Sequence, residues 1–314
     1  MENTTVGRSL LNRRSPLKRS TGDILFSSVL IAPTLFMTIV YILIPVVDSV
    51  VKSFLDFKVK NIISGKPGTW NNFANYIKLF QNDKLMGAIV ATFSFVLFVV
   101  ALQFVFGMIL SLILNSKIRF ARFLRSVIMT PWVVPTIISA LVWMWIFQPQ
   151  YGLLKYIVEF FSGGSITGFA MLNNPDTALL GIGIAALWKQ IPLTTLLLLA
   201  GLQNVPEEMI EAATIDGAGK VRTFFNIVLP YLKSVIKVAM SMAIIENFKQ
   251  FPLVWTMTGG GPDNATTTLA VLSYREAFVS NNLGSGAAVT TVWMLIMIVV
   301  IFIYNKLLGS TEMD

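Results

Sequence analysis

The sequence predicts an all-α, polytopic membrane protein with six transmembrane helices, and three observations support this fold class. Apolar residues make up 55% of the 314 residues and charged residues only 13%, which is too little charge for the surface of a soluble domain. Four long runs, each above the ~20 residues that a membrane span needs, contain no charged residue: 24–47, 85–116, 126–154 and 277–305. These unbroken runs also lack the alternation of barrel strands, which disfavours a transmembrane β-barrel.

The apolar runs predict a single transmembrane domain over residues 24–308. Its six spans are expected at residues 24–47, 85–114, 126–147, 178–201, 236–257 and 286–306. A basic tail, residues 1–23, precedes it and contains Arg8, Arg13, Arg14, Lys18 and Arg19; a short end, residues 309–314, follows it. A cleavable signal peptide could begin with such a tail. The apolar run that follows is too long for one and has no small-x-small cleavage site, so we expect an uncleaved first span.

The distribution of Lys and Arg predicts that both termini lie in the cytoplasm. With this orientation, 14 of the 24 Lys and Arg residues fall in cytoplasmic segments and 8 in outer loops. The remaining two, Lys189 and Lys249, fall inside predicted spans. Six of the eight Lys and Arg residues in outer loops lie in segment 48–84, and they weaken the excess of positive charge on the cytoplasmic side. The net charge of +8 therefore fits span orientation and contact with lipid headgroups, and does not indicate nucleic acid.

The composition argues against catalysis by this chain. Cys and His are both absent, which removes disulfides, thiolate metal sites and the commonest general base. No G-x-x-x-x-G-K-[ST] phosphate loop occurs, so the chain cannot hydrolyse ATP by that route. We therefore expect no catalytic residue, no metal site and no cofactor bound by this chain.

The polar loop at residues 204–230 predicts a helix, a glycine turn and a second helix on the cytoplasmic side. Pro206 suits the start of a helix, and Asn204 is a plausible cap. We expect positive φ at Gly217 and Gly219, then a second helical stretch over residues 220–229 that Pro230 bounds. From these residues alone, an amphipathic helix pair resting on the bilayer is an equally good interpretation.

The residues of this loop resemble a known motif. The motif consists of Glu211-Ala212-Ala213, then Asp216-Gly217-Ala218, then Ile227-x-Leu229-Pro230. It is similar to the EAA loop of permease subunits of ATP-binding-cassette (ABC) importers. Segments 125–135, 151–154, 199–206, 258–262 and 284–288 resemble the sugar-importing branch, the family of the maltose permease subunits. The resemblance covers about residues 70–305, with Ser285 where that family often has an aromatic residue, and without a large inserted outer domain.

The resemblance implies a set of partners and coupling residues. The first loop helix would dock on an ATPase through Glu211, Ala212, Ala213, Asp216, Gly217, Ala218 and Pro230. ATP and magnesium would bind to that ATPase. The complete importer would hold a second homologous permease, two ATPase subunits and an extracytoplasmic sugar-binding protein, in the inner membrane of a bacterium. Its substrate would be a carbohydrate, an oligosaccharide, moved by alternating access.

Two polar clusters interrupt the fourth and fifth predicted spans, at residues 188–192 and 246–252. An ionisable group at bilayer depth costs ~2.5–3.5 kcal/mol on insertion scales, so such residues need partners or a water-filled cavity. Pro192 and Pro252 can kink both helices. The resemblance places Gln190, Leu193, Glu246, Asn247 and Gln250 against the substrate.

The residues leave several alternatives open. Glu246 and Lys249 share a helix face, so they could form an ion pair with only a structural role. Lys189 and Lys249 could serve an acidic sugar, although local pairing of Lys189 is the better interpretation. The protein could also be an ABC permease for another small solute. An ion-coupled secondary transporter would leave the loop at residues 211–230 unexplained and should show an inverted repeat, which is not visible.

Overall fold

The computed structural model describes residues 21–116 and 119–307, and nearly all of its regular structure is helical. The all-α prediction is therefore confirmed. Most of the basic tail and the end at residues 309–314 lie outside the described residues. The chain divides into two compact units, Met1–Val51 and Lys52–Asp314, which are described separately here. In the first unit, α1 (Thr21–Thr38) continues through the π-helical segment η1 (Ile39–Leu43) into α2 (Ile44–Ser53), whose last two residues belong to the second unit.

Small elements occupy the start of the second unit, between the first and second predicted spans. Strand β1 (Leu55–Asp56) pairs antiparallel with β2 (Thr69–Trp70), and α3 (Val59–Ile63) lies between them in the chain. Helix α4 (Ala74–Phe80) follows. The buried Asn75 amide donates to the carbonyls of Ser53 and Leu55, both at 2.9 Å, and so ties α4 to β1.

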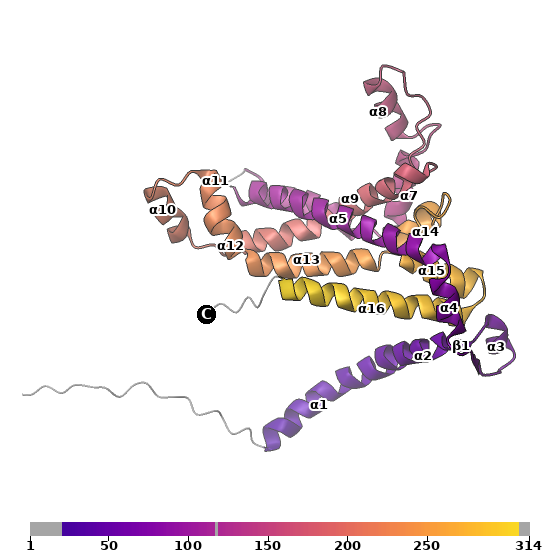
Figure 1. The fold of residues 1–314 in the computed structure, drawn as a ribbon. Helices are drawn as coiled ribbons and strands as arrows, with labels where there is room; N and C mark the ends of the chain where they lie inside the picture. The colour runs from indigo at the N-terminus through magenta and orange to yellow at the C-terminus, as the bar shows by residue number, and fades with distance from the viewer. Residues whose placement is uncertain (1–20, 117–118, 308–314) are drawn as a thin grey trace, which may run out of the picture. The chain divides into compact units, whose positions relative to one another are not determined.

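Three long helices coincide with the second, fourth and sixth predicted spans (Figure 1). They are α5 (Asp83–Asn115), α9 (Pro175–Leu202) and α16 (Leu283–Leu307). The side chains of Asn82 and Asn174 accept from backbone N–H groups two residues on, which caps α5 and α9. A Cβ added at Gly183 would lie 2.6 Å from the Phe98 ring, so the absence of a side chain there lets α9 approach α5 closely without displacing that ring.

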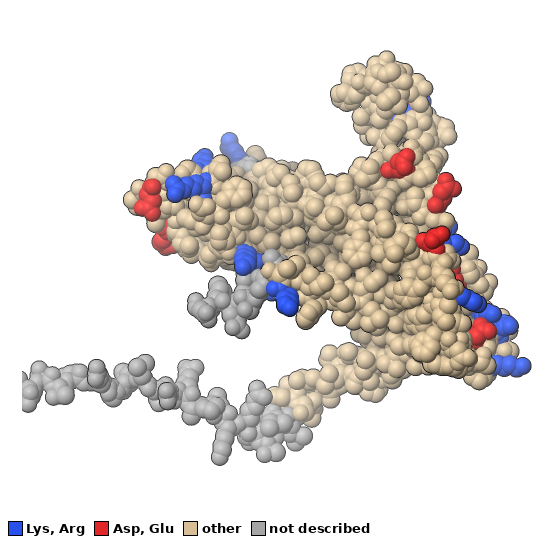
Figure 2. Space-filling model, viewed as in Figure 1, with Lys and Arg blue, Asp and Glu red and all other residues tan. Residues whose placement is uncertain are grey.

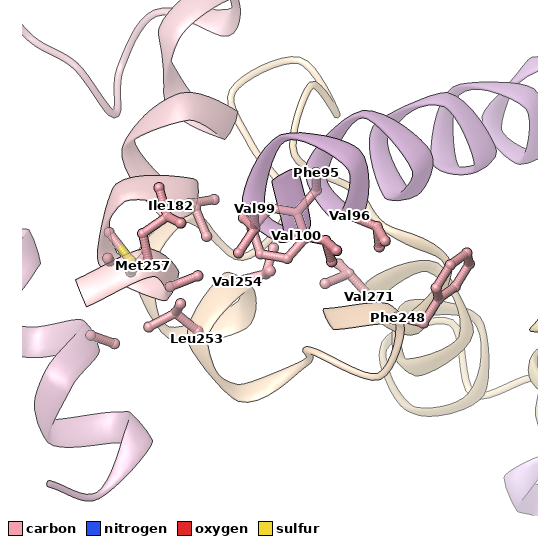
Figure 3. Close-up of a cluster of buried hydrophobic side chains, with 14 of the residues drawn as sticks. Phe95, Val96, Val99, Val100, Ile182, Phe248, Leu253, Val254, Met257 and Val271 are labelled. Atoms are coloured by element: carbon pink, nitrogen blue, oxygen red, sulfur yellow. The ribbon is translucent and has the colours of Figure 1, made fainter. Parts of the chain in front are cut away.

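The main buried core of the second unit joins α5 and α9 to the short helix α14 (Pro252–Thr258) (Figure 3). Phe95 and Val99 of α5, Ile182 of α9, and Leu253 and Val254 of α14 are all at most 1% exposed. The interior of this unit is therefore packed, and polar residues within it need internal partners.

The third and fifth predicted spans are each divided between two helices, and for the fifth the sequence analysis had pointed to a kink at Pro252. Residues 126–147 are divided between α6 (Ala121–Val133) and α7 (Thr136–Ile146), which meet at 93°. Pro135 causes this break because it lacks the N–H that would continue the helix. Residues 236–257 are divided between α13 (Lys233–Phe248) and α14. Pro192, by contrast, lies inside the continuous α9.

By length and composition, four helices in the described part of the chain can cross a membrane, or up to six if each bent pair counts as one span. The second bent pair joins residues 220–231 to α13 at 70°. In the view of Figure 2, charged side chains of the second unit gather near its two ends and leave a band without charge between them. This distribution suits a membrane-embedded middle.

The remaining elements are short. They are α8 (Leu153–Phe161), α10 (Glu207–Ile215), α11 (Lys220–Thr223), the π-helical segment η2 (Phe224–Val228), α12 (Leu229–Tyr231), α15 (Leu269–Tyr274) and the π-helical segment η3 (Arg275–Val279).

Candidate functional site

A cavity of about 590 Å³ lies midway along α9, where α5, α6, α7, α13 and α14 contribute to its walls. Its lining consists of amides, a few charges and apolar side chains: Gln103, Trp132, Thr136, Lys189, Gln190, Leu193, Thr194, Leu197, Ala239, Met242, Ala243, Glu246, Lys249, Gln250 and Pro252. Four of the five residues predicted for the substrate path are in this set; Asn247 is not. A larger cavity of about 980 Å³, lined by α5 and η3 among others, contains none of the five.

Asn247 lies behind the cavity wall and holds Gln190 from there. Its side chain is buried, with only 2% of the residue exposed. Its Nδ2 donates to the Ala243 carbonyl at 2.9 Å and to Gln190 Oε1 at 2.8 Å, while its Oδ1 accepts from Gln190 Nε2 at 3.1 Å. Because a carbonyl can only accept, the Ala243 contact fixes which side of the Asn247 amide is the NH2 group. The Gln190 amide must then place its oxygen opposite that NH2 group and its own NH2 group opposite the Asn247 oxygen. Gln190 keeps one N–H and one lone pair for other partners.

Gln103 of α5 is a polar residue that the sequence reasoning missed. It is 4% exposed, and its Nε2 donates to Thr194 Oγ1 at 2.6 Å. Its Oε1 accepts from Asn247 Nδ2 at 3.4 Å. The only available indication was a lone amide in the middle of a charge-free run, which does not identify a partner. The structure thus joins α5, α9 and α13 through one buried amide cluster.

Glu246 and Lys249 form the ion pair that their spacing on the helix allows. Lys249 Nζ lies 2.8 Å from Glu246 Oε1, and both side chains are about half exposed, at 53% and 54%. The two residues also line the cavity. Pairing and a position on the cavity wall therefore occur together, although the sequence analysis treated them as alternatives.

Lys189 occupies the break between α6 and α7. Its Nζ donates to the Trp132 carbonyl at 3.3 Å and, over a shorter distance, to the Val134 carbonyl. The last carbonyls of a helix have no partner within it, and a cation there is favoured by the helix dipole. The structure thus shows local pairing of Lys189, the better of the two sequence interpretations.

We expect Lys189→Met to lower the stability of the protein by about 1.5–3 kcal/mol, because two carbonyls lose a charged donor. The thermal unfolding midpoint of the detergent-purified chain measures this effect. Lys249→Met is the matched control. Its half-exposed ion pair should contribute ~0–1 kcal/mol. An unfolding midpoint for Lys189→Met as high as that of Lys249→Met would contradict the assigned role.

The loop predicted to contact an ATPase forms the expected helix and turn. Helix α10 ends in paired capping bonds: Gly217 N–H donates to the Thr214 carbonyl at 3.1 Å and Ala218 N–H to the Ala213 carbonyl at 2.9 Å. Gly217 has a φ of 73°, as predicted. Gly219 has a φ of −72°, so the prediction of positive φ there was wrong.

The residues predicted for coupling lie mostly on the surface of this loop. Glu211, Ala212, Asp216, Gly217 and Pro230 are exposed, Ala218 is half-buried and Ala213 is buried. The apolar side chain of Ile215 is 86% exposed and that of Val221 72%. Within the described residues, the outer surface of α10 is therefore open to a partner.

One detail of the loop differs from the prediction. The Asn204 side chain does not cap α10, which follows Pro206 with no side-chain cap. The Asn204 carbonyl instead accepts from the Tyr231 hydroxyl at 2.8 Å, which links the two ends of the loop. The second helical stretch ends at Tyr231, one residue beyond Pro230, and the chain bends there by 70°. Pro230 thus lies close to the boundary that it was predicted to mark.

The family model described as the inner membrane component of binding-protein-dependent transport systems matches residues 103–310. This segment contains every residue that lines the 590 Å³ cavity, and the whole of the loop. The chain belongs to this family. It is the membrane-embedded, non-enzymatic component of such a transport system, with several apolar helices in the inner membrane.

Curated relatives of this inner membrane component match it over nearly the whole length of both chains. The trehalose/maltose transport system permease protein of Thermococcus litoralis is 33% identical, over 88% of this chain and 91% of the relative. The sulfoquinovosyl glycerol permease protein of Agrobacterium fabrum is 31% identical, over 93% and 92%. The sn-glycerol-3-phosphate permease protein of Yersinia pestis is also 31% identical, over 86% and 89%.

Solved structures share the fold of this inner membrane component. The crystal structure of a bacterial ABC transporter that imports the acidic polysaccharide alginate contains a chain with a TM-score of 0.78. That chain is 16% identical, and the match covers 93% of this chain and 97% of that one. A second structure of an alginate transporter, in complex with an alginate pentasaccharide-bound periplasmic protein, gives a TM-score of 0.76.

Proposed function

We propose that this chain is the permease subunit of an ATP-driven, binding-protein-dependent importer for carbohydrate, specifically an oligosaccharide. The observation that carries the proposal is the 590 Å³ cavity, because Gln190, Glu246 and Gln250 bring amides and a carboxylate to one wall. Sugar hydroxyls both donate and accept hydrogen bonds, and amides do the same. The relatives that transport trehalose or maltose and sulfoquinovosyl glycerol support a sugar-like substrate.

The chain would form half of a pore, completed by a second homologous permease. Two ATPase subunits would bind ATP and magnesium and dock on α10, and an extracytoplasmic sugar-binding protein would deliver the substrate. Both termini would lie in the cytoplasm. Closure of the ATPases would move the α10 helices together and expose the cavity alternately to the two sides. An exposed α10 held by a rigid turn supports this arrangement.

The charged groups of the cavity favour a neutral sugar in the conformation observed. Lys189 binds main-chain carbonyls and Lys249 binds Glu246, so both cations of the wall are engaged. A permease for an anionic solute remains the second candidate, since a relative transports sn-glycerol-3-phosphate. An ion-coupled secondary transporter would not account for the loop at α10, which the family match includes.

The proposal is tested by comparing uptake in cells whose chromosomal gene for this protein is deleted, with and without a plasmid that encodes it. We expect uptake of labelled neutral oligosaccharides such as maltodextrins to require the plasmid-borne chain, and to stop when ATP is depleted while the ion gradient is kept. Uptake that follows the ion gradient without ATP would contradict an ATP-driven importer. Uptake restricted to anionic sugars would contradict the neutral class.

The buried amide cluster leads to a prediction about substrate affinity. We propose that Asn247 and Gln103 are positioning residues that orient the Gln190 carboxamide toward the cavity. Asn247→Leu keeps the branched shape of the side chain but removes the hydrogen-bond partner of Gln190, which should cost about 1–3 kcal/mol of substrate binding. We expect the half-saturating concentration for uptake to rise ~10-fold at an unchanged amount of complex in the membrane.

Thr291→Val is the matched control for this substitution. It also removes a buried polar group, since Thr291 is 8% exposed and donates to the Ala287 carbonyl at 2.9 Å, but it does not line the cavity. It should leave the half-saturating concentration unchanged. Equal concentrations for Asn247→Leu and wild type would show that Gln190 needs no support from Asn247.

A further inference from the structure

Helix α8 exposes a continuous apolar face. Its large apolar side chains recur at the spacing of one helix side, and they are Leu153, Tyr156, Ile157, Phe160 and Phe161. Their exposed fractions range from 44% for Ile157 to 82% for Phe161. Within the described residues, nothing covers this face.

On a helix at a water-exposed surface the charged side chains face outward, but on α8 the charged side chains are the less exposed ones. The side chains of Lys155 and Glu159 are only 25% and 27% exposed, far less than the phenylalanines. They pair with each other at 3.9 Å, and Lys155 Nζ also donates to the Gln150 carbonyl at 3.2 Å. The charges are thus satisfied within the protein, and α8 presents its aromatic side outward.

The exposed face of α8 continues an apolar surface that begins on α7. Leu141 and Trp145 of α7 are 50% and 72% exposed, and Tyr151 in the connection to α8 is 56% exposed. The rings of Trp145 and Tyr151 contact edge to face, with centroids 6.4 Å apart. Trp and Tyr gather where membrane helices reach the headgroup layer. Figure 1 shows α8 beyond the end of α7 and away from α5, α9, α13 and α16.

We propose that α8 is an interfacial helix whose aromatic face lies in the lipid at the headgroup boundary, beside the C-terminal end of α7. A short helix with an apolar face this exposed binds a bilayer by burying that face ~5–10 Å below the headgroups. Because Lys155 and Glu159 neutralise each other, the apolar contact drives this binding and anionic lipid is not required. The helix would act as a lateral anchor for the α6–α7 segment.

The absence of cysteine makes the test direct, since a single introduced Cys can be labelled without removing others. Phe160→Cys carries a spin label on the proposed lipid face. Ser165→Cys carries one in the exposed loop beyond the helix and is the matched control. Both variants are reconstituted in phosphatidylcholine nanodiscs, and a monodisperse peak in size-exclusion chromatography shows that each is folded. Power saturation then measures the access of oxygen and of a water-soluble nickel chelate to each label.

We expect oxygen to reach the label at residue 160 much more readily than the nickel chelate does, and the opposite order at residue 165. Replacing a quarter of the lipid by phosphatidylglycerol should leave both values unchanged. Equal access of the nickel chelate to the two labels would overturn the proposal. Protection of residue 160 that appears only when the other transporter subunits are added would also overturn it, because a protein would then cover the face.

Discussion

Replacing Gly217 by valine is expected to reduce docking of the proposed ATPase on α10 at least about tenfold. Gly217 has a φ of 73°, and its N–H closes the cap of α10 on the Thr214 carbonyl. A β-branched residue in this left-handed conformation costs roughly 1–3 kcal/mol. The turn would therefore adopt another conformation, and the orientation of α10 would change. Among the described residues, no atom beyond the chain neighbours of Gly217 lies within 4 Å of a Cβ at this position, so the effect comes from backbone conformation and not from a clash.

Gly219→Val is the matched control for this turn. Gly219 is two residues away and also has open space around it, but its φ of −72° suits any residue. We expect wild-type amounts of ATPase to co-purify with Gly219→Val and at most about a tenth of that amount with Gly217→Val. If both variants retained the ATPase equally, the conformation of Gly217 would have no part in coupling.

Replacing Gly286 by alanine is expected to prevent accumulation of the folded protein. A Cβ there would lie 2.6 Å from the Cβ of Ala277, 2.8 Å from its N and 2.9 Å from its Cα. These are mostly backbone atoms of η3, which cannot move aside without shifting the whole segment against α16. Overpacking of this kind costs typically 1–3 kcal/mol, and more where the backbone must move.

Gly87→Ala is the control, because it makes the same change in another long helix, where no described atom outside the adjacent turns of that helix lies within 4 Å of the added atom. Fluorescence-detected size-exclusion chromatography of tagged variants measures the amount of folded protein. We expect a loss of most of the monodisperse peak for Gly286→Ala and wild-type amounts for Gly87→Ala. A full peak for Gly286→Ala would show that η3 and α16 are less tightly packed than the structure indicates.

The long apolar runs were sufficient to predict α5 and α16, because a helix in lipid must satisfy its own backbone and needs ~20 apolar residues. The span at residues 178–201, which α9 contains, was predicted although the polar cluster at residues 188–192 interrupts its apolar run. The sequence marked Pro252, which follows the break after Phe248, as a possible kink, but it did not predict the break at Val134–Pro135. A proline shows where a helix can break, but the outcome depends on whether distant groups satisfy the freed carbonyls. Lys189 does so for Trp132, whereas α9 continues through Pro192.

The candidate site was predictable from the resemblance only to the level of segments. Glu246 and Asn247 are adjacent on α13 and point about 100° apart, and only Glu246 lines the cavity, whereas both members of other adjacent pairs, such as Lys189 and Gln190, do. Which of them lines the cavity depends on how α13 is rotated about its axis relative to α5 and α9. This rotation could not be predicted from the sequence. Gln103 was invisible for the same reason, since its role depends on Thr194 and Asn247 across two helix interfaces.

Affinity purification of the intact chain in mild detergent tests most directly whether it is the membrane half of an ATP-driven pump. We predict that an ATPase with a phosphate-loop sequence co-purifies in stoichiometric amount, together with a second permease. Glu211→Lys reverses a charge on the exposed surface of α10 and should remove the ATPase while leaving the second permease bound. Recovery of the chain alone or only with itself, with transport in vesicles driven by an ion gradient and not by ATP, would contradict the proposed mechanism.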